Sequence, residues 1–334
     1  MDMLRLFPEL EKEGIDFIDL GCSGTLDAKW HALFPLLNYV GFDPNTTECQ
    51  RLSALPSSYR HTRYMPYAIS GEIKRAVMHV TRSPHCSSLL SPRHTWLRRF
   101  TYHALFEEVT ETDVDCVTLD HLNTREHLRA DVIKLDTQGL ELPILRAAAT
   151  ILPQTFCVET ETGYVENYIG ETVSSDMDDF MRKNGFMLFD VTIHRVGRDN
   201  HYAELSRKQP LWCESLWLRD YLSQESWGIP VPVPDRHQAC KALLICKVLG
   251  FADYGYELSE YFNDQGLISD QEKALLADPR TWDNKLSLAF DLGVTLFRLL
   301  PGPWRRKLLP VLQRSIGKPH LLRGLIDRTP VKGS

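Results

Sequence analysis

The stretch that decides the fold is Ile15-Asp16-Phe17-Ile18-Asp19-Leu20-Gly21-Cys22-Ser23-Gly24. Its first six residues include several β-formers in a short apolar run, which predicts a buried strand, and the glycines that follow predict a tight turn. Residues 25–37 then carry apolar side chains at helical spacing. A strand, a glycine turn and a helix in this order open a nucleotide-binding βαβ unit.

A second strand is predicted at residues 39–42, and Asp43 follows it directly. Asp43 comes roughly twenty residues after the glycine turn, which is the spacing at which a carboxylate contacts the ribose hydroxyls of a bound nucleoside. The turn holds Gly21 and Gly24 but lacks the further glycine of the dinucleotide pattern. These features predict a nucleoside ligand without a pyrophosphate, and S-adenosylmethionine is such a ligand.

The composition is that of a globular protein. The chain has 334 residues and a net charge of −6, which argues against non-specific binding to nucleic acid. Its eight cysteines form no CxxC pair and no zinc-finger spacing, which indicates free thiols in a reducing cytosol. Residues 1–10 lack a signal pattern, and no apolar run approaches the ~20 residues that span a bilayer.

Predicted strands and helices alternate from about residue 15 to residue 220, which indicates a doubly wound, mostly parallel α/β sheet. Ligands bind such sheets beyond the carboxyl ends of the strands. Acids follow four predicted strands, namely Asp43, Asp120, Asp136 and the pair Glu159 and Glu161. We expect them to converge on one polar pocket. The alternative for each acid alone is a helix cap or a surface ion pair.

The sequence predicts three regions. Residues 1–225 form the α/β domain, residues 226–236 form a Pro-rich linker, and residues 237–334 form a helical C-terminal appendage. Residues 281–334 hold ten lysines or arginines and only three aspartates. Apolar and basic residues interleave over residues 285–325, which predicts either contact with a membrane surface or packing on the body or on a second subunit of a homo-oligomer.

The most specific motif is Lys134-Leu135-Asp136-Thr137-Gln138-Gly139-x-Glu141. With it, the chain resembles the FkbM family of S-adenosylmethionine-dependent methyltransferases over roughly residues 15–220. The other segments that carry the resemblance are 19–24, 40–44, 86–89, 117–120, 131–133, 159–161 and 216–219. The resemblance implies a Rossmann-like class I methyltransferase fold with an antiparallel last strand. One departure is Asp43, where many relatives carry the longer Glu.

The resemblance also implies a set of site residues. In the cofactor site, the glycine turn would shape the methionine side, and Asp43 would hold the ribose diol. The residues expected to bind S-adenosylmethionine are Asp19, Gly21, Cys22, Ser23, Gly24, Asp43, Pro44, Ala68 and Asp136.

Methyl transfer needs a group that orients the acceptor hydroxyl and removes its proton. Asp136 is our first candidate for this role and Glu159 our second, and His85 is the one histidine that we expect at the site. Convergent carboxylates could instead hold a divalent metal, which we do not favour. Glu141 has two readings, either a functional residue or a partner for the dipole of the helix that follows.

The function that these features imply is O-methylation of a hydroxyl on a sugar, glycan, glycolipid or natural product by a cytoplasmic enzyme, with the acceptor unidentified. The partners expected are a small-molecule or glycan acceptor and no nucleic acid. Two alternatives remain open, a nicotinamide-dependent oxidoreductase and a non-catalytic protein that keeps the fold.

Overall fold

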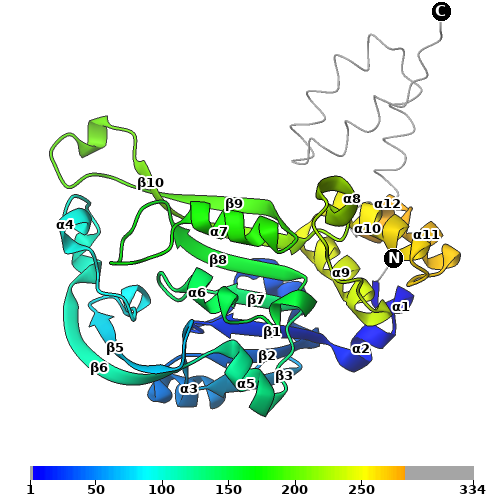
Figure 1. Cartoon of the computed structure of the whole chain (residues 1–334), viewed down its shortest axis with the longest axis horizontal. Coiled ribbons are helices and arrows are strands. Elements are labelled where there is room, and N and C mark those ends of the chain that lie inside the picture. Colours follow the sequence, from blue (N-terminus) through cyan, green and yellow to red (C-terminus); the bar gives the residue numbers. More distant parts are fainter. Residues whose placement is uncertain (1–2, 283–334) are drawn as a thin grey trace, which may run out of the picture. The chain divides into compact units, whose positions relative to one another are not determined.

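The structure, a computed structural model, describes residues 3–282. Within these residues, a seven-stranded sheet has the order β3-β2-β1-β7-β8-β10-β9 (Figure 1). The strand bounds are β1 Ile15–Leu20, β2 Leu37–Phe42, β3 His61–Met65, β7 Val132–Leu135, β8 Cys157–Gly163, β9 Phe186–Val196 and β10 Gln209–Arg219. The neighbours of β1, β2 and β7 are all parallel, whereas β10 runs antiparallel to both β8 and β9. This order confirms the predicted doubly wound, mostly parallel sheet with an antiparallel last strand.

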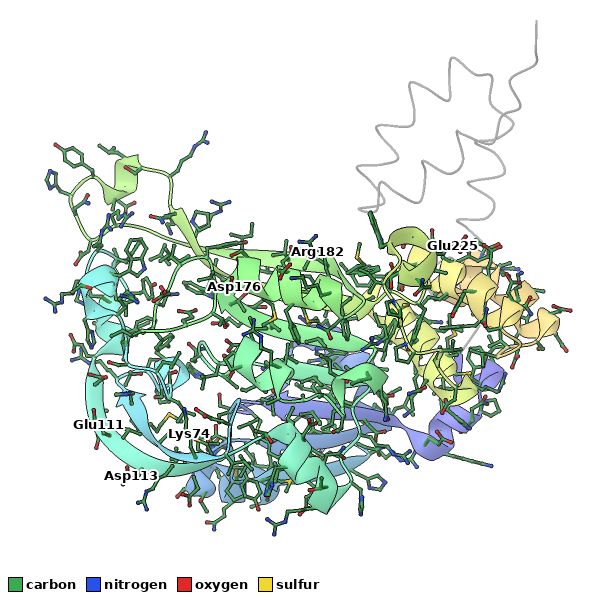
Figure 2. All side chains as sticks on the ribbon, in the orientation of Figure 1. Lys74, Glu111, Asp113, Asp176, Arg182 and Glu225 are labelled. Carbon is green, nitrogen blue, oxygen red and sulfur yellow. The ribbon has the colours of Figure 1, made fainter. Side chains whose placement is uncertain are left out.

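A three-stranded sheet of order β4-β6-β5 stands beside the main sheet. It consists of β4 Ala68–Ile69, β5 Lys74–Thr81 and β6 Glu108–Val117. Lys74, Glu111 and Asp113 of its long antiparallel pair are exposed (Figure 2).

The helices lie before, between and after the strands. Their bounds are α1 Met3–Leu6, α2 Glu9–Glu13, α3 Thr46–Ser53, α4 His94–Leu97, α5 Leu119–Glu126, α6 Glu141–Arg146, α7 Ser174–Lys183, α8 Ser223–Trp227, α9 Arg236–Leu249, α10 Ala252–Asp264, α11 Asp270–Leu276 and α12 Pro279–Trp282. Within residues 3–282, no helix has both the length and the apolar character needed to cross a membrane.

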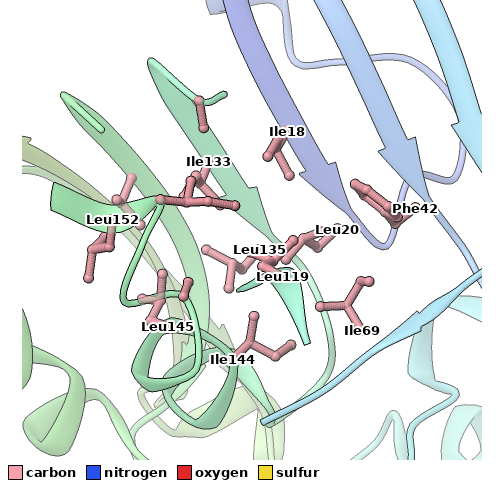
Figure 3. Close-up of a cluster of buried hydrophobic side chains, with 14 of the residues drawn as sticks. Ile18, Leu20, Phe42, Ile69, Leu119, Ile133, Leu135, Ile144, Leu145 and Leu152 are labelled. Carbon is pink, nitrogen blue, oxygen red and sulfur yellow. The ribbon is translucent and has the colours of Figure 1, made fainter. Parts of the chain in front are cut away.

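One face of the main sheet packs against helices α5, α6 and α7. Its buried side chains alternate along β1 and β7 and meet apolar residues of these helices (Figure 3). Members of this cluster are Ile18, Leu20, Ile133, Leu135, Leu119, Leu145 and Met177. Alternate residues of β1 point to the opposite face, where the rings of Phe17 and Trp30 pack edge to face at 5.3 Å. The period-two burial that defines a sheet core is therefore present on both faces.

The α-helix predicted at residues 25–37 is a 3₁₀ helix over Ala28–Leu36. Its buried residues are Trp30, Leu33 and Leu36, which lie three apart. A spacing of three stacks side chains on one face of a 3₁₀ helix, whereas an α-helix needs a mean spacing of 3.6. Pro35 lies inside this helix, where its missing N–H would break an α-helical ladder.

Residues 2–274 form one compact unit, and a second unit begins at Leu275. The first unit includes α9, whose residues 239–246 are all buried. Lys241 of α9 bonds to the carboxylates of Asp131 at 2.7 Å and Asp16 at 3.3 Å. The predicted boundaries at residues 225 and 236 stay predictions, and the interleaved basic stretch of residues 285–325 lies outside the described residues.

The turn after β1 gives a stability prediction. A Cβ on Gly21 would lie 2.1 Å from the carbonyl oxygen of Asp136, and Gly21 has a φ of +84°. We expect Gly21→Ala to lower the free energy of unfolding by about 2–5 kcal/mol, because it adds a backbone clash to left-handed strain. Urea unfolding followed by circular dichroism measures this loss.

Gly24→Ala is the matched control for this substitution. Gly24 also has a positive φ, of +91°, but nothing lies within 4 Å of a Cβ built there. We expect this variant to lose only ~1–2 kcal/mol of unfolding free energy, which is the cost of a left-handed backbone at a residue with a side chain. Equal losses in the two variants would contradict the close approach of Gly21 to Asp136.

Candidate active site

The glycine turn after β1 is fixed to the end of β2. The backbone N–H groups of Gly21 and Cys22 both donate to the carbonyl of Phe42, at 2.9 and 3.1 Å. Cys22 is buried beneath the turn, and burial raises the pKa of its thiol above the ordinary value. The turn therefore presents Ser23 and Gly24, and not the thiol, to the space above the sheet.

Asp43 and Pro44 follow β2 at the neighbouring strand end. One carboxylate oxygen of Asp43 accepts from the backbone N–H of Asn45 at 2.7 Å. Asn45 in turn caps α3 through its side-chain oxygen. Burial raises the pKa of the Asp43 carboxyl, and the one hydrogen bond from Asn45 opposes that shift.

The turn after β7 is built by a buried carboxylate. Gln138 and Gly139 have φ angles of +54° and +101°. The Glu141 carboxylate accepts from the N–H of Thr137 at 2.8 Å and from that of Gly139 at 3.0 Å. Glu141 is fully buried and lines no cavity of the site, and its carboxylate holds this turn. The turn directs Asp136 and Gln138 into the space above the sheet.

These three turns surround a cavity of about 850 Å³. Asp43 and Asp136 both line it, as the hypothesis of a shared pocket required. The other expected cofactor residues that line it are Gly21, Ser23, Gly24, Pro44 and Ala68. Apolar walls come from both sheets and their connections and include Phe42, Tyr67, Ile69, Met78, Val80 and Val114. The cavity thus combines an apolar wall with carboxylates at its rim, as small-ligand sites do.

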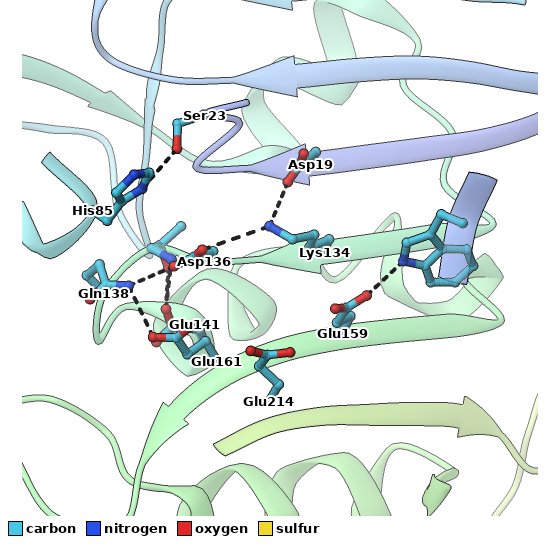
Figure 4. Close-up of polar contacts among 12 residues, drawn as sticks. Asp19, Ser23, His85, Lys134, Asp136, Gln138, Glu141, Glu159, Glu161 and Glu214 are labelled. Carbon is cyan, nitrogen blue, oxygen red and sulfur yellow. Dashed lines mark hydrogen bonds and ion pairs between the residues drawn. The ribbon is translucent and has the colours of Figure 1, made fainter. Parts of the chain in front are cut away.

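Asp19 and Cys22 do not line this cavity, although the sequence placed them in the cofactor site. Asp19 accepts from the Tyr39 hydroxyl at 2.8 Å and from Lys134 Nζ at 3.2 Å (Figure 4). Burial would lower the pKa of the Lys134 ammonium, but Asp19 and Asp136 outweigh it, so this pKa lies above its ordinary value. Lys134 thereby connects Asp19 to Asp136, whose carboxylate lies 4.0 Å from Nζ.

Two of the expected strand-end acids lie elsewhere. Glu159 accepts from Lys29 Nζ at 2.7 Å and from Trp30 Nε1 at 2.9 Å. It is buried, and it lines neither this cavity nor the second cavity described below. Asp120 lies in the first turn of α5 and accepts from the Thr150 N–H at 3.0 Å. Asp120 follows β6, which belongs to the small sheet. It was expected at the carboxyl edge of the main sheet together with the other acids, but it does not lie there.

A second cavity of about 400 Å³ adjoins the first. His85, Asp136 and Gln138 line both cavities. The expected site residue His85 thus lies at their junction, where its Nδ1 is 3.3 Å from Ser23 Oγ. The second cavity is lined further by Cys86, Tyr102, Glu161, Asn167, Tyr168, His194, Trp212 and Glu214.

The acids of the second cavity bond to neutral or histidine partners. Gln138 Nε2 donates to Asp136 at 2.7 Å and lies 3.4 Å from Glu161 (Figure 4). His194 Nε2 lies 2.9 Å from Glu214. Burial, and then Asp136 and Glu141, raise the pKa of the Glu161 carboxyl to about 8. Among residues 3–282, no three His, Cys, Asp or Glu side chains are grouped as a metal site.

Sequence reasoning placed Glu161 among the strand-end acids of the pocket but gave it no catalytic role, and it missed Glu214 and His194 as site residues. Glu161 lies two residues after Glu159, near the end of β8, so its position was a usable signal. Glu214 faces Glu161 across the antiparallel pair of β10 and β8. That pairing brings together residues 53 positions apart, and no local pattern in the chain reveals it.

Comparison with known proteins gives one family. Residues 28–188 match the family model of the methyltransferase FkbM domain. A search of curated proteins finds no match to the chain. Among solved structures, magnesium protoporphyrin IX methyltransferase from Synechocystis PCC 6803 with bound SAM is similar at 10% identity and a TM-score of 0.28, over 65% of this chain and 76% of that chain. The matched residues 28–188 contain Asp43, Asp136 and Glu161.

Glu141 gives a prediction about pH. Burial raises the pKa of its carboxyl to about 8, above the ordinary 4.5. Between these values the folded state binds more protons than the unfolded state, so this group makes the protein less stable as pH rises from ~4.5 to ~8. We expect Glu141→Gln to remove this pH dependence of the unfolding free energy, which reaches at most about 1.4 kcal/mol per pH unit.

Urea unfolding of both proteins at several pH values between 5 and 8 measures the two slopes. The variant will be less stable at every pH if the turn is weakened, but only the difference in slope reports the proton. Parallel curves for the two proteins would show that Glu141 is ionised across this range.

Proposed function

Because the chain belongs, over residues 28–188, to the methyltransferase FkbM family, we propose that it is a class I methyltransferase that moves a methyl group from S-adenosylmethionine to a hydroxyl of a sugar, glycan or related natural product. The observation that carries this proposal is the cavity of about 850 Å³ that Asp43, Asp136 and the glycine turn share.

The lining of this cavity fits a nucleoside with a charged amino-acid arm. Asp43 has one carboxylate oxygen bonded to Asn45 N, which leaves the second oxygen for a ribose hydroxyl. The apolar wall, with Ile69, Met78 and Val80, suits an adenine ring. At the other end, Ser23 and Asp136 would face the methionine arm.

When bound, S-adenosylmethionine would supply a methyl group on an already activated sulfonium leaving group. The chain must then align the acceptor and exclude water. The loop of residues 84–89 lines the cavity and closes it from the side of the small sheet. His85 and Ser23 link this loop to the glycine turn.

Cofactor binding tests the proposal. We expect isothermal titration calorimetry to detect S-adenosylhomocysteine binding by the purified full chain. Asp43→Asn should weaken that binding about 10- to 150-fold, because hydrogen bonds to a charged group contribute about 1.5–3 kcal/mol. The control is Asp113→Asn, which changes an exposed aspartate of β6 and should leave the affinity unchanged.

A folded protein that takes up neither S-adenosylhomocysteine nor S-adenosylmethionine would refute the proposal. A rise in nicotinamide fluorescence when reduced nicotinamide dinucleotide is added would instead favour an oxidoreductase.

A further inference from the structure

The second cavity joins the first, so a group bound in the second cavity can reach the end of the first. The cavities share Asp136, Gln138 and His85, so a hydroxyl bound in the second cavity can meet a methyl group held in the first. Part of the wall of the second cavity is aromatic, since the rings of His194 and Trp212 stack at 5.0 Å with an interplanar angle of 7°. A flat apolar wall facing polar groups suits a hydroxylated ring.

Two polar atoms among the lining residues have no partner. Tyr102 Oη and Asn167 Oδ1 are buried and make no hydrogen bond to any part of the described chain. Asn167 is only 6% exposed. Buried polar groups in folded proteins are nearly always satisfied, so such atoms call for a ligand or water. Together they offer one hydroxyl donor and one carbonyl acceptor to the hydroxyls of a bound ring.

The carboxylates of the site are satisfied to different degrees. Asp136 accepts from Gln138 at 2.7 Å and has Lys134 Nζ at 4.0 Å. Among residues 3–282, Glu161 has only the long 3.4 Å contact to the same Gln138 nitrogen. The Tyr168 hydroxyl donates to Gln138 Oε1 at 2.8 Å, which turns the amide nitrogen toward the two acids. Of the two acids beside Gln138, Glu161 therefore has the greater free accepting capacity.

Glu161 also has a route to solvent. Glu214 lies directly opposite it in the register of β8 and β10, where facing side chains approach within about 4.5–5.5 Å at Cβ. Glu214 contacts His194, and the side chains of His194 and Glu214 are 33% and 37% exposed. A proton on Glu161 can thus pass through two titratable groups to the surface.

We propose that the second cavity binds the acceptor as an uncharged hydroxylated ring, and that Glu161 is the catalytic base that takes the proton of its reacting hydroxyl. This inference rests on the proposed methyltransferase function. Neither Asp136 nor Glu159 is the base. Asp136 lies beside the reacting groups and orients the acceptor, with Gln138 as a positioning residue for both acids.

The step balances as follows. Glu161 removes the hydroxyl proton while an oxygen lone pair forms the new bond to the methyl carbon. The bond from that carbon to the sulfonium sulfur breaks, and its electron pair stays on sulfur. The products are a methyl ether, a neutral thioether and a protonated Glu161, which returns its proton to solvent through Glu214 and His194.

The ionisation of Glu161 agrees with this role, because a base works best with a pKa near the working pH. Its pKa of about 8 predicts that kcat/KM rises with pH up to roughly that value. The titratable and charged groups that face Glu161 or line the same cavity are Lys134, Asp136, Glu141, Glu171, Glu214, His85, His194, Cys86, Tyr102 and Tyr168.

The test uses the full chain with labelled S-adenosylmethionine and a panel of methyl glycosides of glucose, mannose, galactose and rhamnose. We expect the unaltered protein to label at least one glycoside. Glu161→Gln should lower kcat about 10²- to 10⁴-fold and abolish the rise of kcat/KM with pH. Its affinity for S-adenosylhomocysteine should stay within twofold, which shows that fold and cofactor site are intact.

The control is Glu225→Gln, the same chemical change at an exposed glutamate of α8 (Figure 2), which should leave kcat unchanged. Failure to label any glycoside by protein that binds S-adenosylhomocysteine would overturn this inference and leave cofactor binding standing. Loss of S-adenosylhomocysteine binding by the unaltered protein would instead refute the proposed function. Full kcat in Glu161→Gln together with inactive Asp136→Asn would make Asp136 the base.

Discussion

The arrangement of the site depends on the close approach of the residues that follow two neighbouring strands. Gly21 follows β1 and Asp136 follows β7, and the Asp136 carbonyl occupies the space that a side chain at Gly21 would need. The Asp136 N–H also donates to the Leu20 carbonyl at 2.9 Å, so the two turns are fastened together. Because the turns touch, the residues that they display share one cavity. A larger residue at Gly21 would separate the glycine turn from the carboxylate that faces it.

The residues of the motif around Asp136 have different structural roles, and each role depends on the chemistry of the side chain or backbone. Lys134 neutralises Asp19 below the site and lies near Asp136. Gln138 takes a left-handed backbone and spans two acids, and Gly139 supplies a second positive φ. Glu141 satisfies the N–H groups that such a turn would otherwise leave buried without a partner. Each residue type in this motif therefore follows from a requirement of the turn or of the charges beside it.

Much of this could be predicted from the sequence because the signals are local. The strand, the glycine turn and Asp43 lie within 29 residues, and their spacing led to the cavity that the structure contains. The errors came from pairings between distant segments. Glu159 was a candidate because it lies near a strand end, but Lys29 and Trp30, about 130 residues earlier, donate hydrogen bonds to both of its carboxylate oxygens. The helix at residues 28–36 was predicted as an α-helix because Trp30, Leu33 and Leu37 also fit the spacing of one α-helical face.

A lysine or several backbone N–H groups hold the buried structural acids of this protein, such as Asp19 and Glu141, whereas Asp43 and Glu161 of the site have neither among residues 3–282. Asp19, Asp131 and Glu159 are buried, and each has a lysine within 3.2 Å. A buried carboxylate without such a partner is costly, and it shifts its pKa upward unless something compensates. Asp43 and Glu161 line the cavities, have no lysine or arginine partner among residues 3–282, and have raised pKa values. A protein keeps such acids where a ligand hydroxyl supplies the missing partner, as a ribose diol would for Asp43 and an acceptor hydroxyl for Glu161. In the proposed mechanism Asp136 orients the acceptor and Glu161 takes the proton, because Gln138 and Lys134 already contact the Asp136 carboxylate.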